Sequence, residues 1–227
     1  EALANDFNAM ASRLQENINE LQDSMRRQEE FMGSFAHELK TPMTSIIGYS
    51  DLLRSRSLDD EERQEAANYI FSESRRLESL SIKLLDLLVL KRQDMELSEA
   101  SPSAIISGII RNMKSVLAKQ DIVIKYRCES GSCLLEADLV KSLLINLIDN
   151  SRKGMDGPGI IYILSTMTDT GCTIQVVDNG RGIPEKELDR ITEAFYRVDK
   201  SRSRAQGGAG LGLALCREIA LLHNGDI

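Results

Sequence analysis

The sequence predicts an α+β protein in which an antiparallel pair of long helices precedes a smaller domain of mixed helices and strands. Apolar residues recur with helical spacing through roughly the first hundred positions, whereas the second half carries short runs of strand character and glycine-rich turns. A length of 227 residues suits two domains of modest size. We therefore expect a helical hairpin followed by an α/β domain.

Composition excludes several classes of function. The net charge of -7 argues against a nucleic-acid-binding protein, since contact with a phosphate backbone requires clustered Lys and Arg. The four cysteines have no CxxC spacing and, with two histidines, provide no zinc-binding set, so we expect free thiols in a reducing compartment. We find no apolar run that would span a bilayer and no signal-peptide pattern. Because the chain opens without Met inside a helical pattern, we expect it to be part of a longer protein.

Residues 4–39 carry a heptad repeat of apolar residues that is typical of a coiled coil. Two apolar positions recur in each heptad. Gln28 interrupts the second row with a polar residue of the kind that sets helix register at some cost in stability. The first row consists of Ala4, Ala11, Ile18, Met25, Met32 and Leu39, and the second of Phe7, Leu14, Leu21 and Phe35.

A second helix is expected from about residue 59 to residue 97. Residues 57–62 supply acceptors for an N-terminal cap, with Leu58 placed as a hydrophobic staple and acids in the first turn. The short connection from Arg54 to Asp59 requires the two helices to be antiparallel. The hairpin leaves apolar surface on both helices, and burying such surface is worth about 25 cal/mol per Å². We therefore expect a homodimer that forms a four-helix bundle.

His37 occupies the heptad position furthest from a partner helix, so it should face solvent. A surface histidine without a function is the simpler interpretation of that position taken alone. The surrounding stretch, FMGSFAHELKTPMTSIIGYSDLL, resembles the phosphoacceptor box of sensor histidine kinases, in which SHELRTPLT is usual. Ala36, Lys40 and Met43 are conservative departures from that box.

The second half begins with residues 97–103, which break the helical pattern and are interpreted as a linker. A helix is expected over 104–119, and strands over 121–127 and 133–136. Asp138 is the candidate cap of a further helix, on which Asn146, Asn150 and Lys153 share one face. Such a face is either a ligand-binding wall, because buried amides need polar partners, or a solvated stripe.

Two glycine-rich segments follow a predicted hairpin over 160–166 and 173–177. The second strand delivers Asp178 to the turn DNGRGIP, where its carboxylate can accept from an amine such as that of adenine. Gly180 and Gly182 permit close backbone approach. Residues 193–212 are interpreted as a mobile lid, whose last glycines would present N–H groups to phosphate at a helix N-terminus. Taken singly, the first segment fits a simple turn, as most DxGxG sequences do, and the second fits a glycine loop that serves only flexibility. The lid glycines are Gly207, Gly208, Gly210 and Gly212.

In chain order, NLIDNSRK, DNGRGIP, EAFYRVDKS and GGAGLGLAL resemble the N, G1, F and G2 boxes of the histidine kinase ATP-binding domain. The resemblance implies a dimeric four-helix bundle followed by a two-layer α/β sandwich of the GHKL ATPase and kinase type. It implies three parts: 1–30 as a coiled coil or the end of a HAMP-like signalling helix, 31–97 as the dimerisation and histidine phosphotransfer domain, and 98–227 as the catalytic ATP-binding domain without its last strand. Ser151, Gly154 and the lid sequence TEAFYR depart from the usual Ala, aromatic residue and FEPFYR.

The activity implied by this resemblance is that of an ATP-dependent protein-histidine kinase that uses ATP and Mg²⁺. His37 would accept the γ-phosphoryl group, Glu38 would take the proton of the imidazole, and Thr41 would position a water that dephosphorylates a response regulator. Asn150 would bind Mg²⁺. The residues implied in nucleotide binding are Asn146, Asn150, Lys153, Asp178, Gly180, Gly182, Arg197, Lys200, Gly208, Gly210, Leu211 and Gly212.

The implied partners are a second copy of the chain and the receiver domain of a response regulator. The chain would be the cytoplasmic part of a membrane sensor, attached to the membrane only through a preceding segment. Two other classes stay open. An ATP-hydrolysing conformational machine like gyrase or MutL shares the nucleotide fold but lacks a phosphoacceptor histidine, and a signalling scaffold without catalysis is suggested by Gly154 and the missing last strand. An assay for acid-labile phosphoprotein would be positive only for the kinase and would separate the three classes.

Overall fold

The computed structural model describes residues 2–90, 96–199 and 208–227, with side chains throughout except at 2–6, 8, 9, 11 and 12. The chain divides into two compact units, Glu1–Leu77 and Glu78–Ile227. We describe each unit by itself. No helix in the described ranges has an apolar stretch long enough to cross a bilayer.

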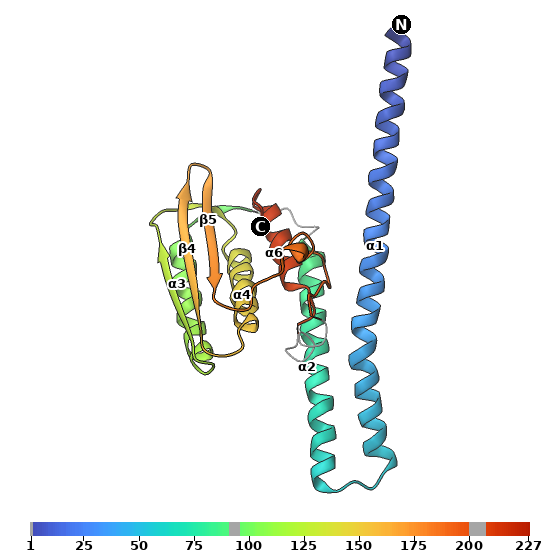
Figure 1. The fold of residues 1–227 in the computed structure, drawn as a ribbon, viewed down its shortest axis with the longest axis vertical. Coiled ribbons are helices and arrows are strands. Elements are labelled where there is room, and N and C mark those ends of the chain that lie inside the picture. Colours follow the sequence, from blue (N-terminus) through green and yellow to red (C-terminus); the bar gives the residue numbers. More distant parts are fainter. Residues whose placement is uncertain (1, 91–95, 200–207) are drawn as a thin grey trace. The chain divides into compact units, whose positions relative to one another are not determined.

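The first unit is built on a helical hairpin (Figure 1). Helix α1 runs over Ala2–Ser55, and α2 over Asp60–Leu90. Asp59 and Glu62 form the predicted cap of α2, since each accepts a hydrogen bond from the backbone N–H of the other, at 3.2 and 2.8 Å. The rings of Tyr49 and Tyr69 stack across the hairpin with centroids 4.6 Å apart. The predicted antiparallel pairing is confirmed; α2 is described as far as Leu90, and residues 91–95, which precede its predicted end near 97, lie outside the described residues.

The second unit contains two sheets. The larger has the strand order β2-β4-β5, in which β2 (Ile122–Cys128) is parallel to β4 (Gly159–Thr168) and β4 is antiparallel to β5 (Gly171–Asp178). The smaller pairs β1 (Ser98–Ala100) with β3 (Cys133–Leu135). Strand β1 lies inside residues 97–103, so their interpretation as a linker is wrong. Three residues are too few to show an alternating pattern, and β1 exists because β3 supplies its hydrogen bonds.

Helices cover one face of the larger sheet, giving two layers (Figure 1). They are α3 (Pro102–Ala118) and α4 (Ala137–Gly154), and α6 (Gly212–Leu222) packs on α4. A short 3-10 turn, η1 (Glu185–Glu187), follows β5. Along β4, alternate residues from Gly159 to Ser165 are buried while those between them are more exposed, as a strand with one covered face requires. The core members include Ile106, Ile109, Leu117, Leu144, Ile148, Ile161 and Ile163.

One local prediction in this unit is wrong. The cap of α4 is Glu136, not Asp138: the Glu136 carboxylate accepts from the backbone N–H groups of Asp138 and Leu139. Glu is an uncommon cap, and Asp138, two residues later, is the better sequence match. The end of β3 at Leu135 places Glu136 in the extended conformation that a cap requires. The position where β3 ends could not be predicted from the sequence.

Candidate functional site

His37 lies on α1 with its side chain exposed, as predicted. The next residue, Glu38, is held by an ion pair with Arg76 of α2, in which Nη2 lies 3.1 Å from Oε2. Only 11% of the Arg76 side chain and 13% of the Glu38 side chain are exposed. The hydroxyl of Thr41 donates to the backbone oxygen of His37 over 3.3 Å. Sequence reasoning missed Arg76, because nothing in its own neighbourhood marks it out.

The predicted polar face of α4 meets the start of α6. The Nδ2 group of Asn146 donates to the Ser142 carbonyl over 2.9 Å, and Oδ1 of Asn146 faces Gly212, where a Cβ would lie 3.2 Å away. The same Cβ would lie 3.9 Å from Nδ2 of Asn150. Asn146 is half-buried but Asn150 is exposed. The polar face of α4 is therefore more open to solvent than the buried, ligand-binding wall considered from the sequence.

The turn after β5 packs on the last turn of α4. A Cβ at Gly180 would come within 2.8 Å of the Gly154 carbonyl oxygen, which also accepts from the Arg181 N–H over 3.2 Å. Oδ1 of Asp178 accepts from the Gly180 N–H over 2.9 Å, and the Asp178 side chain is exposed. Gly182 has a φ of +69°. Gly180 is therefore required for close approach, and Gly182 for its left-handed backbone.

The segment after this turn is tied to the glycine-rich loop before α6. The N–H of Phe195 donates to the Gly210 carbonyl over 2.8 Å, and the two residues have φ values of +67° and +70°. Arg197 and Gly208 are half-buried, and Leu211, directly before α6, is buried. The predicted residues Lys200 and Gly207 lie outside the described residues.

Lys153 is engaged by a carboxylate on its own helix. Its Nζ lies 2.8 Å from Oδ2 of Asp149, whose Oδ1 accepts from Arg152 over 2.7 Å. Burial by itself raises the pKa of Asp149, but the hydrogen bonds and charges of Lys153 and Arg152 outweigh it and bring the pKa below its ordinary value.

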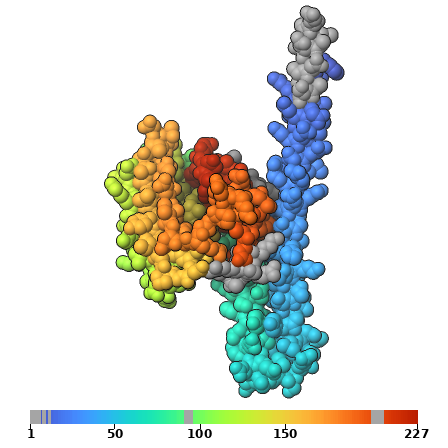
Figure 2. Space-filling model, in the orientation of Figure 1, coloured from blue at the N-terminus to red at the C-terminus, as the bar shows by residue number. Residues whose placement is uncertain are grey.

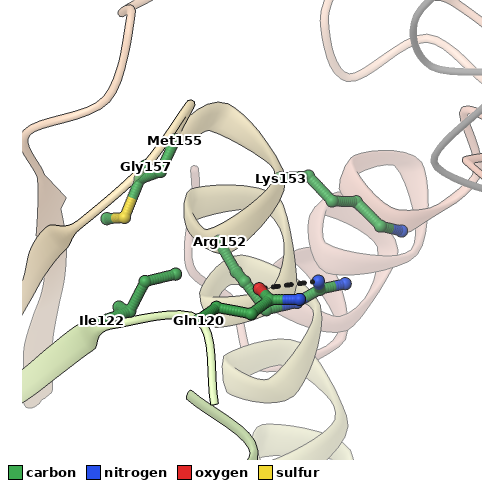
Figure 3. Close-up of a pocket in the computed structure, with 6 residues that line it drawn as sticks. All are labelled: Gln120, Ile122, Arg152, Lys153, Met155 and Gly157. Atoms are coloured by element: carbon green, nitrogen blue, oxygen red, sulfur yellow. Dashed lines mark hydrogen bonds between the residues drawn. The ribbon is translucent and has the colours of Figure 1, made fainter. Parts of the chain in front are cut away.

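A cavity of about 320 Å³ lies beside the end of α4 (Figure 3). Gln120, Ile122, Arg152, Lys153, Met155 and Gly157 line it. Among the predicted nucleotide-binding residues only Lys153 takes part, and the side chains of Arg152 and Gln120 are hydrogen-bonded to each other over 3.2 Å. The cavity is therefore separate from the place where Asn146, Asn150 and Gly212 meet.

Two contacts that sequence reasoning missed fasten α6 to α4. Nε2 of His223 accepts from the Glu136 N–H over 3.0 Å, which requires the ring proton on Nδ1, 2.8 Å from the Ile219 carbonyl. Sγ of Cys216 lies 3.5 Å from the Leu143 carbonyl, and burial raises the pKa of this thiol to about 12. These contacts join residues far apart in sequence, so no local pattern reveals them.

Comparison with known proteins matches both halves of the chain. Residues 27–88 match the His Kinase A (phospho-acceptor) domain, and residues 136–227 match the histidine kinase-, DNA gyrase B-, and HSP90-like ATPase. Sensor protein kinase WalK of Staphylococcus saprophyticus is 33% identical over 218 residues, and that of Staphylococcus epidermidis 32%. The chain belongs to the sensor histidine kinases. It spans 35% of the length of each of these two relatives, and the match covers 92% of the chain itself.

Solved histidine kinases share the fold. Histidine kinase ThkA in complex with response regulator protein TrrA gives a TM-score of 0.71 at 22% identity, covering 91% of this chain and 60% of that one. Acinetobacter baumannii histidine kinase AdeS gives 0.59 at 21% identity, covering 82% and 86%. The predicted architecture of a helical hairpin followed by a GHKL-type sandwich is thus confirmed.

Proposed function

We propose that this chain is the catalytic core of a sensor histidine kinase that transfers the γ-phosphoryl group of ATP to His37 and then to an aspartate of a response regulator. The observation that carries the proposal is the meeting of three separate boxes around the end of α4. Asn146 and Asn150 adjoin Gly212, and Gly154 adjoins the turn that contains Gly180. Phosphoryl transfer depends chiefly on positioning and charge neutralisation, which such an arrangement can supply.

The nucleotide would be held by backbone and side-chain groups of these boxes. The exposed carboxylate of Asp178 has one oxygen bound to the Gly180 N–H, which leaves acceptor capacity for the adenine amine. The first N–H groups of α6, from Gly212 onward, have no carbonyl partner within the helix and suit phosphate oxygens. Arg197, Lys200, Gly208, Gly210 and Leu211 would complete the phosphate side of the site. On nucleotide binding, the ammonium group of Lys153 would leave the carboxylate of Asp149 and contact a phosphate oxygen instead.

The donors present also suit Mg²⁺. Asn150 is exposed, so its amide oxygen is available to a hard cation that retains waters and takes its remaining ligands from phosphates. Asn146 would support Asn150 from one turn earlier on α4. Bound there, Mg²⁺ would neutralise charge on the phosphate oxygens.

On the helical unit, an imidazole nitrogen of His37 would attack the γ-phosphorus, forming the N–P bond as the bond to the ADP oxygen breaks. The proton on the other imidazole nitrogen would pass to Glu38, whose carboxylate Arg76 holds in place. In a separate phosphatase reaction, Thr41 would direct a water at the phosphoaspartate of the response regulator, which releases inorganic phosphate and restores the aspartate.

We propose a homodimer because the predicted seam of α1 is exposed in the single chain. Phe7, Leu14, Leu21 and Met25 expose between 55% and 66% of their surface. All residues from 13 to 30 are exposed, and they form the blue column of side chains in Figure 2. An apolar row of this kind needs a partner helix.

The remaining expectations rest on the family. The solved ThkA complex contains a response regulator protein, which supports such a partner here. We keep residues 1–30, 31–97 and 98–227 as the proposed signalling helix, phosphotransfer domain and ATP-binding domain. Attachment to a membrane would be through a segment that precedes residue 1.

The test is autophosphorylation with γ-labelled ATP and Mg²⁺, followed by mass spectrometry of the intact chain and mapping of the modified residue. We expect one acid-labile phosphoryl group on His37, which His37→Gln abolishes while ATP binding is retained. Asn150→Ala should lose Mg²⁺-dependent labelling. ATP hydrolysis without any labelled protein would support the conformational machine instead, and an unlabelled chain that does not hydrolyse ATP would support the scaffold.

A further inference from the structure

Two of the four cysteines lie near each other in the second unit. Cys133 begins β3 and Cys172 lies at the start of β5, and these two strands contact each other. A Cβ at Gly131, two residues before Cys133, would lie 2.9 Å from Cγ of Met167, the residue paired with Cys172 between β4 and β5. The thiols of Cys133 and Cys172 also interact with each other. Both are reduced and half-buried, so small molecules in solution can reach them. The pair is formed by the fold alone, because the two residues are far apart in sequence and belong to different sheets.

The other two cysteines are placed differently. Cys216 is completely buried in α6, with its sulfur directed at the Leu143 carbonyl. Cys128, at the end of β2, lies opposite Ser165 in the strand pairing. They provide internal controls for any reaction that depends on two adjacent thiols.

We propose that Cys133 and Cys172 are a modification site that forms a reversible disulfide when the chain meets a low-molecular-weight disulfide such as oxidised glutathione. The cross-link joins the small β1–β3 sheet to the β2-β4-β5 sheet. It goes beyond the proposed kinase activity and does not depend on it.

The reaction balances as two thiol–disulfide exchanges. Burial, with the neighbouring Cys133 adding to it, raises the pKa of Cys172 to about 11 and keeps that thiol protonated at neutral pH, so the first attack falls to Cys133. The Cys133 thiolate attacks a sulfur of oxidised glutathione, breaks its S–S bond and releases one glutathione thiolate. The sulfur of Cys172 then displaces the second glutathione. The cysteine pair loses two electrons and two protons, and oxidised glutathione becomes two molecules of glutathione.

The cross-link should stabilise the ATP-binding domain without altering its nucleotide site. Asp178 lies six positions after Cys172 in β5, which corresponds to about 20 Å along an extended strand. Closing a long loop removes entropy from the unfolded chain. We therefore expect the melting temperature to rise by about 5 °C or more, with ATP affinity changed less than about twofold.

The experiment treats the whole reduced chain with excess oxidised glutathione, blocks the remaining thiols and digests the product. Trypsin leaves Cys128 and Cys133 together in the peptide 128–141, so a second cleavage after Glu129 is needed to separate them. We expect the peptide with Cys133 to be linked to that with Cys172, on a monomeric denatured chain two mass units lighter than the reduced one. Stable mixed disulfides with glutathione, a link from Cys128, or links only between chains would each overturn the proposal.

Serine variants give the matched controls. Cys128→Ser should form the same link and show the same rise in melting temperature on oxidation. Cys133→Ser and Cys172→Ser, checked for native circular dichroism, should lose both. If oxidation raises the melting temperature equally in Cys133→Ser, the stabilisation does not come from this pair and the proposal fails; linked peptides in the wild-type chain remain decisive even if a serine variant does not fold.

Discussion

Gly210 combines a backbone demand with a packing demand. Its φ of +70° favours glycine. A Cβ at this position would lie 2.7 Å from the carbonyl carbon of Phe195 and 2.8 Å from the backbone oxygen of Tyr196. Gly210→Ala should therefore destabilise the second unit by roughly 1–3 kcal/mol and weaken ATP binding at least tenfold. Urea unfolding and titration with a fluorescent nucleotide measure the two effects. Gly108→Ala is the control. A Cβ at this glycine of α3 would meet open space, and Ala has the higher helix propensity, so the free energy of unfolding should rise by about 0.5–1 kcal/mol.

Arg76 is the residue on which the Glu38 carboxylate depends. Because both side chains are nearly buried, Arg76→Met, which removes the ion pairs of Arg76 with Glu38 and with Glu73, should cost about 3 kcal/mol of unfolding free energy. Adding Glu38→Gln should restore part of the loss. Arg63→Met provides the contrast, since the ion pair of Arg63 with Asp60 is exposed and should be worth at most about 1 kcal/mol. Equal costs for Arg76→Met and Arg63→Met in urea unfolding would contradict the assigned importance of burial.

At the scale of elements, the last two turns of α4 are stabilised by a charge cluster that responds to pH. The folded-state pKa of Asp149 is lowered, so its contribution is fully present above the ordinary carboxyl pKa of about 3.9 and is lost as the pH falls through the lower folded value. Asp149→Asn should cost roughly 1 kcal/mol at pH 7. The difference from wild type should shrink below pH 4, as thermal unfolding at both pH values can measure. A difference that stays constant down to pH 3 would mean that the carboxylate charge is not the cause.

The whole molecule should be a dimer held by the seam of α1. Leu21→Glu places a charge in the second apolar row and should dissociate the dimer at micromolar concentration, as measured by sedimentation equilibrium. Gln28→Leu, in the same row, should instead strengthen association, because it removes the polar interruption. A wild-type chain that sediments as a monomer at this concentration would remove the basis for the dimer.

Much of the architecture could be predicted because its determinants are local. The heptads, the Asp59–Glu62 cap, the β4–β5 hairpin and the exposure of His37 depend on residues within a few positions of each other. Strand β1 and the Glu136 cap could not be predicted, since each depends on the position of β3. The lid residues Lys200 and Gly207 stay predictions.

The sequence by itself determined the fold class, the order of the boxes and the family, because periodicity and motifs are properties of neighbouring residues. Only the tertiary structure decided which distant groups meet: Glu38 with Arg76, Gly180 with Gly154, His223 with Glu136, and Cys133 with Cys172. The physical reason is that these contacts arise when separate elements pack together, and neither partner needs a distinctive sequence around it for the contact to form.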